Sequence, residues 1–311
     1  MVFTIIADVV FEGGGIRGIG HIGALNYMEA CGWRWVRAAG SSVGALIAAL
    51  LVAGYTAREM KRIITEIDFE KFKDKSGVRS IPFLGKPLGL LMENSIYSGD
   101  YVERWVQDLL LDKGIKTFGH ISKNGKCPLK IIASDITRHR MLVLPEDLAY
   151  YGIRPMDFPI AKAVRMSISI PFYFKPVILA YKNTRSFIVD GCVTCCYPIN
   201  IFDVPGKPRW PTIGFKFKRK NISYTGLGRT DALSFLLDVA TTMSQGQVTE
   251  DMLEKNKARS IEIPTFDVEA TDFNISREKT HLLYKHGYRS AIDFMKSWDF
   301  NEYVRKYRSL S

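Results

Sequence analysis

The chain has 311 residues, of which 47% are hydrophobic and 12% aromatic, ample for a sizeable buried core. Its 43 lysine and arginine residues against 32 aspartate and glutamate residues give a net charge of +11, which favours anionic partners: nucleic acid, acidic substrates or an anionic membrane surface. The longest apolar run, residues 45–54, is shorter than the roughly 18–20 residues that a membrane-spanning helix needs. These totals predict a globular protein with no membrane-spanning segment.

Cysteine usage favours a cytoplasmic protein. The five cysteines are odd in number and scattered, and no basic segment followed by a cleavable apolar segment opens the chain. The cluster CVTCC at 192–196 raises the question of a metal site. However, no second Cys/His cluster completes four ligands, and His281 and His286 are five residues apart rather than four. We therefore expect no metal and no other cofactor.

Strand and helix patterns alternate along the first 67 residues. Residues 4–11 are a continuous apolar run, as in a parallel strand that is covered on both faces. Thr56 and Glu59 have the spacing of a capping box at the start of a helix. The expected elements are strand 4–11, helix 19–30, strand 33–39, helix 43–54 and helix 57–67.

The remaining elements indicate an α/β fold with a mixed, largely parallel central sheet flanked by helices. No linker, internal repeat or low-complexity tract divides the chain, so we expect a single domain over 1–311. Segment 71–97 is a candidate flap insertion, and 265–311 is a C-terminal helical part. Further strands are expected at 129–136, 140–144, 185–190, 212–217 and 259–264, and helices at 100–112, 155–165, 231–247 and 277–297.

A glycine loop follows the first strand. Gly13, Gly15 and Gly18 satisfy the G-x-G-x-x-G pattern of dinucleotide-binding proteins, between a strand and a helix. That fold needs an acidic residue about 20 positions later, at the end of the second strand, to bind the ribose. Here the sequence GSSVG at 40–44 stands in its place. A nucleotide-binding oxidoreductase is therefore disfavoured.

The sequence Gly40-Ser41-Ser42-Val43-Gly44 matches the nucleophile elbow G-x-S-x-G, whose central residue is Ser42. Because a helix begins at once, its free N–H groups, that of Val43 included, face any negative charge formed on an acyl oxygen. Gly13, Gly14 and Gly15, in the adjoining strand-to-helix turn, are expected to add donors to this oxyanion hole. The alternative is a tight turn that only packs helix on strand.

Two interpretations remain for the group that activates Ser42. Asp190, followed by Gly191, leaves an apolar strand where the active-site loops of open α/β sheets converge, although Asp-Gly turns are common. The order Ser…Asp…His, with His281 or His286, would instead suit a Ser-His-Asp esterase of the α/β-hydrolase type. In that fold the elbow follows several strands, and both histidines lie in a helical pattern.

The chain resembles the patatin-like phospholipase family in five segments taken in order. These are GGGIRG, GSSVG, residues 133–144, residues 164–177 and the Asp190-Gly191 pair. The resemblance runs from about residue 5 to 200 and more loosely to the C-terminal helix. It implies a three-layer acyl hydrolase with a Ser-Asp dyad and no histidine: Ser42 as nucleophile, Asp190 as base, and Gly13 to Gly15 as the oxyanion loop accompanied by Arg17. The chain departs from the family pattern at Cys192, where glycine or alanine usually follows Asp-Gly.

The function expected from this resemblance is hydrolysis of lipid esters of the phospholipase A or lysophospholipase type. The substrate would be a phospholipid or another acyl-ester lipid, met at an anionic membrane surface that the protein joins peripherally. Segment 71–97 and the basic tract 216–221 are candidate membrane contacts. The rival from another class is a non-catalytic lipid-binding module. No nucleic acid is expected, since no RNA-binding aromatic signature is present.

Overall fold

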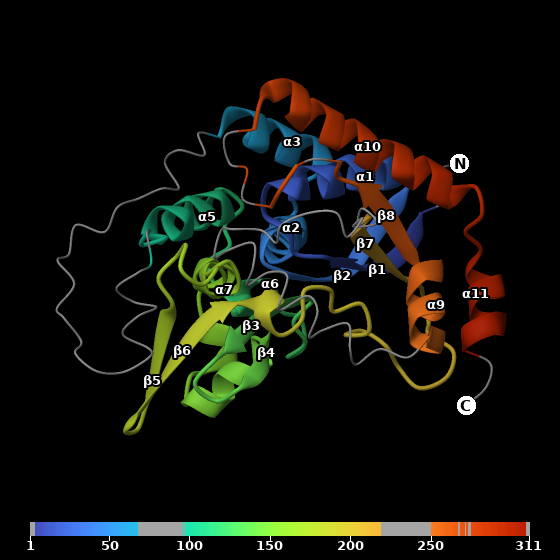
Figure 1. Cartoon of the computed structure of the whole chain (residues 1–311). Coiled ribbons are helices and arrows are strands. Elements are labelled where there is room, and N and C mark those ends of the chain that lie inside the picture. Colours follow the sequence, from blue (N-terminus) through green and yellow to red (C-terminus); the bar gives the residue numbers. More distant parts are fainter. Residues whose placement is uncertain are drawn as a thin grey trace.

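The computed structural model describes residues 4–67, 95, 97–218, 250–266, 268–270, 272 and 275–308. Its strands form a mixed sheet in the order β5-β6-β3-β2-β1-β7-β8, with β4 paired to β3 (Figure 1). β1, β2, β3, β7 and β8 pair in parallel, and β4, β5 and β6 are antiparallel to their partners. The strands are β1 (Ile5–Phe11), β2 (Trp33–Ser41), β3 (Leu129–Asp135), β4 (Arg140–Leu144), β5 (Val177–Tyr181), β6 (Thr184–Asp190), β7 (Thr212–Lys218) and β8 (Ser260–Pro264).

Helices connect the parallel strands and pack on the sheet. α1 runs from β1 to β2, and α2 follows β2 and packs on β1, β2 and β3. α10 packs on α1 and β8, with α3 beside it at the top of Figure 1. The described α-helices are α1 (Gly18–Ala30), α2 (Val43–Val52), α3 (Ala57–Glu66), α5 (Asp100–Asp112), α6 (Phe118–Ile121), α7 (Ile160–Ser167), α9 (Glu250–Ala258), α10 (Arg277–Met295) and α11 (Phe300–Tyr307). None of them is both long and apolar enough to cross a lipid bilayer.

The central strands are buried on both faces, which explains their continuous apolar sequences. Successive side chains of a strand point to opposite faces. On one face Val9 and Phe11 join the core formed with the helices. On the other face Val10 and Ala39 pack against Ile199 and Phe202. The predicted fold class, a mixed and largely parallel sheet flanked by helices, is confirmed.

The predicted strands agree with the observed ones to within two residues at each end, and so do five of the predicted helices. The predicted capping box is present at the start of α3. The helix expected at 155–165 starts later, at Ile160. Its first part is a short 3₁₀ turn at Pro155–Asp157, and Pro159 keeps Phe158 extended. Strand β5 and helices α6 and α9 were not predicted, and α11 lies within the C-terminal part expected to be helical. The predicted helix 231–247, residues 71–94 and 96 of the expected flap, and residues 219–221 of the basic tract lie outside the described residues.

The strand register brings three chain segments to one edge of the sheet. β1 and β2 are parallel, with Phe11 opposite Gly40, so the turns that follow them leave the sheet side by side. β3 lies next to β2, with Ile132 opposite Ser41. The end of β6 reaches the same place from the antiparallel direction, with Asp190 opposite Ala133.

A cluster of ion pairs around Asp203 anchors the segment that follows β6. The carboxylate of Asp203 accepts hydrogen bonds from Arg259 Nη1 at 2.6 Å and Lys255 Nζ at 3.2 Å, and it forms an ion pair with Arg308 Nη2 at 3.1 Å. The Arg259 side chain is only 2% exposed. Burial pushes the pKa of Asp203 upward, but the surrounding cations together hold it below its ordinary value. The cluster ties residues 200–203 to α9, β8 and the end of α11.

We expect Asp203→Ala to lower the free energy of unfolding by about 3 kcal/mol, because it leaves the buried Arg259 guanidinium without its carboxylate. Urea denaturation followed by circular dichroism measures the change. The matched control is Asp293→Ala, which removes an exposed carboxylate paired with Lys296 and Arg289 on α10 and should leave the midpoint unchanged. Equal midpoints for the two variants would contradict the anchoring role of Asp203.

Candidate active site

Ser42 occupies a strained turn between β2, which ends at Ser41, and α2, which begins at Val43. Its φ of 53° and ψ of −126° are rare for a residue with a side chain and mark a position that the surroundings enforce. The Ser42 N–H donates to Ser167 Oγ at 2.9 Å, and the Ser167 hydroxyl donates to the carbonyl of Ile132 at 2.5 Å. The turn is therefore fastened to α7 and β3.

Two glycines permit this turn by letting backbones approach closely. A Cβ at Gly40 would overlap the backbone of Gly44, and a Cβ at Gly44 would overlap the carbonyls of Phe11 and Glu12. α2 thus starts directly against the end of β1. The N–H of Val43, the first of α2, has no acceptor among the described residues and is available to an external oxyanion.

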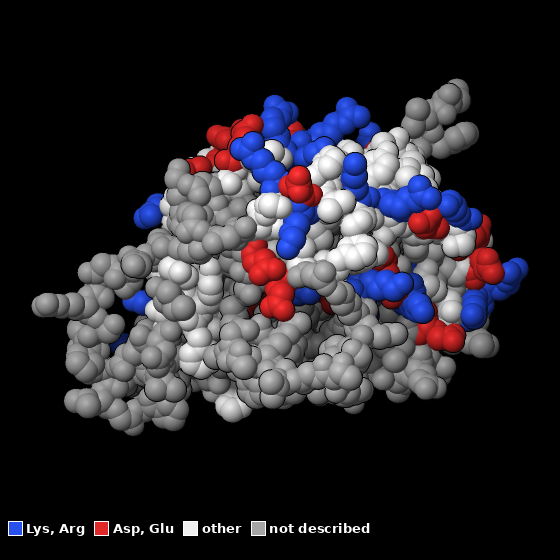
Figure 2. All heavy atoms as spheres, turned by 45° about the horizontal axis from the view of Figure 1, so that its top comes forward, with Lys and Arg blue, Asp and Glu red and all other residues white. Residues whose placement is uncertain are grey.

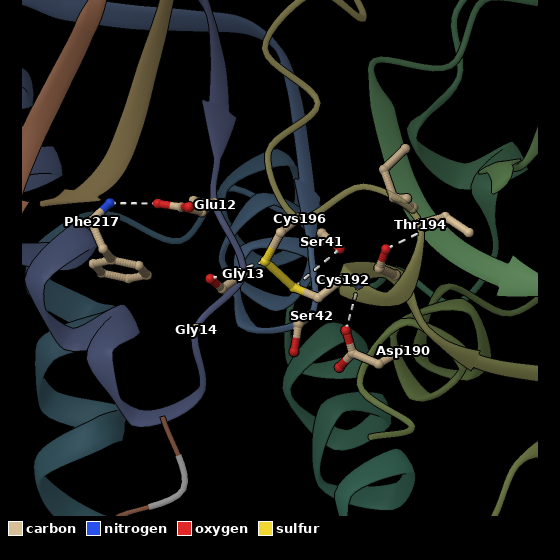
Figure 3. Close-up of a disulfide and its surroundings, with 12 residues drawn as sticks. Glu12, Gly13, Gly14, Ser41, Ser42, Asp190, Cys192, Thr194, Cys196 and Phe217 are labelled. Carbon is tan, nitrogen blue, oxygen red and sulfur yellow. Dashed lines mark hydrogen bonds between the residues drawn. A yellow bond between two sulfur atoms is a disulfide. The ribbon is translucent and has the colours of Figure 1, made fainter. Parts of the chain in front are cut away.

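The carboxylate of Asp190 faces the hydroxyl of Ser42 (Figure 3). Asp190 is the last residue of β6, is 1% exposed, and accepts a hydrogen bond from Cys192 N to Oδ1 at 2.8 Å. Oδ2 accepts no hydrogen bond of good geometry from the described residues. Burial raises the pKa of Asp190 to about 7. The Cys192 N–H and the Ser42 hydroxyl each lower this pKa, but the effect of burial is larger. The carboxylate is therefore a base of useful strength near neutral pH.

The glycine loop follows β1 beside this pair. The Gly13 N–H donates to the Cys196 carbonyl at 2.9 Å, so this N–H is already engaged. The N–H groups of Gly14 and Gly15 donate to no other group in the described part of the chain. The Gly14 carbonyl accepts from both Arg17 N and Arg17 Nε at 3.2 Å. In a trans peptide the N–H of Gly15 points opposite to this carbonyl, so Arg17 orients that N–H.

Buried side chains support the loop from behind. His21 Nε2 lies 2.9 Å from the carbonyl oxygen of Glu12, and its ring stacks on Phe217 with centroids 4.2 Å apart. Phe217 N donates to Glu12 Oε2 at 2.5 Å. Burial lowers the pKa of His21 to about 3, so this histidine stays neutral. A Cβ at Gly14 would strike the Phe217 ring, which therefore sets the position of the loop.

An apolar cavity opens beside Ser42, whose hydroxyl is the only one among the described residues that line it. Walls come from the start of α1, from α2, α3 and α5, and from residues 168–174. The side chains include Ile16, Leu46, Ile64, Trp105 and Phe174. Such a surface can accept a hydrocarbon chain beside the Ser42 hydroxyl.

The late histidines do not join this site. His281 is exposed on α10, and His286 is half-buried against Phe266, where burial lowers its pKa. Neither forms a hydrogen bond with Ser42 or Asp190 among the described contacts, and no histidine contributes to the pKa shift of Asp190. The described residues therefore assemble no Ser-His-Asp triad at Ser42.

The structure brings together most of the residues singled out from the sequence. Gly18 packs against Val43, and Gly191 packs against Ser41 Oγ and the Ile132 carbonyl. Sequence reasoning missed the Ser167 contact, the support from Glu12 and Phe217, and the disulfide between Cys192 and Cys196. The CVTCC cluster carried a signal for the disulfide, but spacing alone does not say which cysteines meet.

The chain matches the sequence model of a family described as Patatin-like phospholipase over residues 9–203. It is 38% identical over 299 residues to the uncharacterized protein YqhO of Bacillus subtilis (strain 168), an alignment that covers 94% of this chain and 99% of that protein. It is 28% identical over 193 residues to the probable lipid hydrolase 463L of Invertebrate iridescent virus 6, covering 62% of each.

Two solved structures have a similar fold. VipD from Legionella pneumophila gives a TM-score of 0.53 at 19% identity and covers 94% of this chain and 67% of that one. The type III effector protein ExoU of Pseudomonas aeruginosa gives 0.53 at 14% identity and covers 96% of this chain. This chain spans about half of ExoU, at 53%. At these identities the similarity concerns the fold.

We expect Asp190→Asn to stabilise the protein increasingly as the pH rises. The folded protein raises the pKa of Asp190 to about 7, so wild-type stability is full below about pH 4 and declines as the pH rises through about 7. Asparagine does not titrate and avoids this loss. In differential scanning calorimetry, the Tm of the variant minus the Tm of the wild type should increase between about pH 5 and about pH 8. A Tm difference that stays constant over this range would contradict the burial of an ionising carboxylate.

Proposed function

This chain belongs to the patatin-like phospholipase family, and we propose that it is a serine acyl hydrolase that cleaves fatty-acid esters of phospholipids or related lipids. The observation that carries the proposal is the meeting of three features at one point: a hydroxyl on a strained turn, a buried carboxylate opposite it, and an apolar cavity that opens beside it. The resemblance to the probable lipid hydrolase of the iridescent virus supports the same substrate class.

Ser42 is the proposed nucleophile and Asp190 its base. The Asp190 carboxylate accepts the hydroxyl proton as Ser42 Oγ attacks the ester carbonyl carbon, and it returns the proton to the leaving alcohol. A water molecule then attacks the acyl-enzyme with the same assistance. The raised pKa of Asp190 suits this role, because a carboxylate at its ordinary pKa is a poor acceptor for a hydroxyl proton. The reaction scheme requires no metal or other cofactor.

The oxyanion is proposed to form at the backbone N–H groups of Val43, Gly14 and Gly15. The helix start offers the first donor with the positive end of the α2 dipole, and the glycine loop offers the other two. Arg17 acts as a positioning residue through its two hydrogen bonds to the Gly14 carbonyl. Removing one such donor typically costs about 10²–10³ in rate.

Contact with an anionic membrane surface is proposed for the face formed by α3 and α10. Lys61 Nζ lies 4.2 Å from the ring centroid of Tyr284, so the two helices are neighbours. Lysine and arginine side chains are spread over this face in Figure 2, with acidic side chains between them. Phe266 and Leu282, 56% and 50% exposed, add apolar contacts. The exposed cations of the two helices are Arg58, Lys61, Arg62, Arg277, Lys279, Lys285, Arg289 and Lys296.

We expect Ser42→Ala and Asp190→Asn each to reduce hydrolysis of p-nitrophenyl butyrate by at least about 10³-fold, because each removes a partner of the chemical step. The double variant His281→Ala, His286→Ala is the control and should retain wild-type turnover. A fluorophosphonate probe followed by peptide mass spectrometry should label Ser42. Wild-type turnover in the serine variant would end the proposal, and a loss of turnover in the histidine variant would favour the Ser-His-Asp esterase. Lipid binding without any turnover would favour the non-catalytic module.

We expect Leu46→Trp to shift preference toward short acyl chains, because the larger ring fills the cavity beside Ser42. The measured quantity is the ratio of kcat/KM for p-nitrophenyl palmitate to kcat/KM for p-nitrophenyl butyrate. This ratio should fall by about tenfold or more. The matched control is Leu111→Trp on the outside of α5, where the leucine is 46% exposed, and it should leave the ratio as in wild type. A ratio that is the same in both variants would show that the acyl chain lies elsewhere.

A further inference from the structure

A disulfide joins Cys192 to Cys196 in the loop that follows Asp190. The first half of this loop is tied to the base. Cys192 N donates to Asp190 Oδ1 at 2.8 Å, and Cys195 N donates to the Gly191 carbonyl at 2.9 Å. Ser134 Oγ on β3 lies 2.8 Å from the Asp190 carbonyl oxygen. This half of the loop therefore moves with the carboxylate and the sheet.

The second half of the loop is tied to the glycine loop. The Cys196 carbonyl accepts the N–H of Gly13 at 2.9 Å, and Cys196 Sγ lies 3.5 Å from the Gly13 carbonyl oxygen. Both polar groups of Gly13 are thus in contact with one cysteine. The position of Cys196 therefore sets the position of Gly13, the residue that precedes Gly14 in the glycine loop.

The disulfide joins the two halves of this loop (Figure 3). Cys192 is 5% exposed, and its sulfur accepts from Ser41 Oγ at 3.8 Å. A Cβ at Gly13 would overlap Cys192 Sγ and would come within 3.1 Å of Ser42 Cβ. The sulfur of Cys192 is therefore enclosed by the elbow on one side and the glycine loop on the other.

Opening the bond requires the two sulfurs to separate. Bonded sulfurs lie about 2 Å apart, whereas unbonded atoms of this size come no closer than about 3.5 Å. Cys192 Sγ has no room to move toward Ser41 or Gly13, so the displacement falls on Cys196 and on the Gly13 peptide that it holds. A shift of about 1 Å in a catalytic group can cost about 100-fold in rate.

We infer that the Cys192–Cys196 pair is a reversible redox site whose disulfide form holds the oxyanion loop in its working position and whose dithiol form is less active. This inference rests on the proposed acyl hydrolase function. Cys196 is half-buried and so is reachable from solvent, unlike Cys192. The pair lies outside the reacting groups and acts through the Gly13 loop and Asp190.

The oxidant is a low-molecular-weight disulfide such as oxidised glutathione. The Cys196 thiolate attacks one sulfur of that disulfide, forms a mixed disulfide and releases one glutathione thiolate. The Cys192 thiolate then attacks the Cys196 sulfur and releases the second glutathione. The two protein thiols give up two electrons and two protons in total, and one glutathione disulfide becomes two glutathione thiols.

The first experiment measures the bond itself and does not depend on catalysis. The intact protein is equilibrated in glutathione buffers of graded oxidised-to-reduced ratio, alkylated with N-ethylmaleimide and mapped by peptide mass spectrometry. We expect the cross-linked 192–196 peptide to increase with the oxidised fraction, with Cys195 alkylated at every ratio. Alkylation of both Cys192 and Cys196 at every ratio would refute the redox site.

The second experiment measures turnover of p-nitrophenyl butyrate in the same samples. We expect kcat to fall by about tenfold or more as the bond opens and to recover on reoxidation. Cys195→Ser is the matched control and should keep wild-type turnover and the full redox response. Cys192→Ser and Cys196→Ser should each give turnover that does not depend on the glutathione ratio. Because Cys196 is half-buried, its variant remains informative should the serine at the buried position 192 prevent folding.

The outcomes separate this inference from the proposed function. Turnover that depends on Ser42 but stays constant while the mapped bond opens would overturn the redox site alone. Turnover that persists in Ser42→Ala would overturn the hydrolase proposal, and with it the expected change in kcat, while the mapped redox equilibrium of the bond would still stand.

Discussion

The parallel pairing of β1 and β2 is the constraint on which the site depends. With Phe11 opposite Gly40, the chain leaves both strands at the same edge of the sheet, and the two turns that follow are neighbours. Gly44 then lets α2 begin directly against the carbonyls of Phe11 and Glu12. The distance between the elbow and the glycine loop is therefore set by sheet hydrogen bonds rather than by the loops themselves. Loops on such a rigid frame hold catalytic groups accurately.

The second constraint is the buried carboxylate of Asp190, whose pKa no cation of the described residues lowers. Asp190 is 1% exposed, and its pKa is raised because burial outweighs the hydrogen bond from Cys192. A buried acid of this kind costs folding free energy above its pKa, and such costs concentrate at functional sites. An apolar cavity opens beside Ser42, the residue that this carboxylate faces.

Parts of the chain beyond the family match complete the site. The match ends at residue 203, yet Phe217 on β7 supports Glu12 and stacks on His21 behind the glycine loop. The Ala270 carbonyl accepts the N–H of Ile16 at 3.0 Å, and a Cβ at Gly15 would overlap that carbonyl. YqhO aligns over 94% of this chain, so the similarity to that protein extends well past the family match. The disulfide closes the loop that follows Asp190, and the Cys196 carbonyl of that loop accepts the N–H of Gly13 in the glycine loop.

The sequence by itself determined most of the described elements and their order, because hydrophobic periodicity, glycine turns and the Thr56–Glu59 capping box are local signals. It also identified Ser42 as the centre of an elbow, since that motif is contiguous. Only the tertiary structure decided that Asp190 faces Ser42, that His281 and His286 stay apart from both, and that Cys192 bonds to Cys196 rather than to Cys195. The same holds for the engaged N–H of Gly13. These relations join residues about 150 or more positions apart, or depend on the path of a loop, and so they follow from sheet register and packing, which no local pattern encodes.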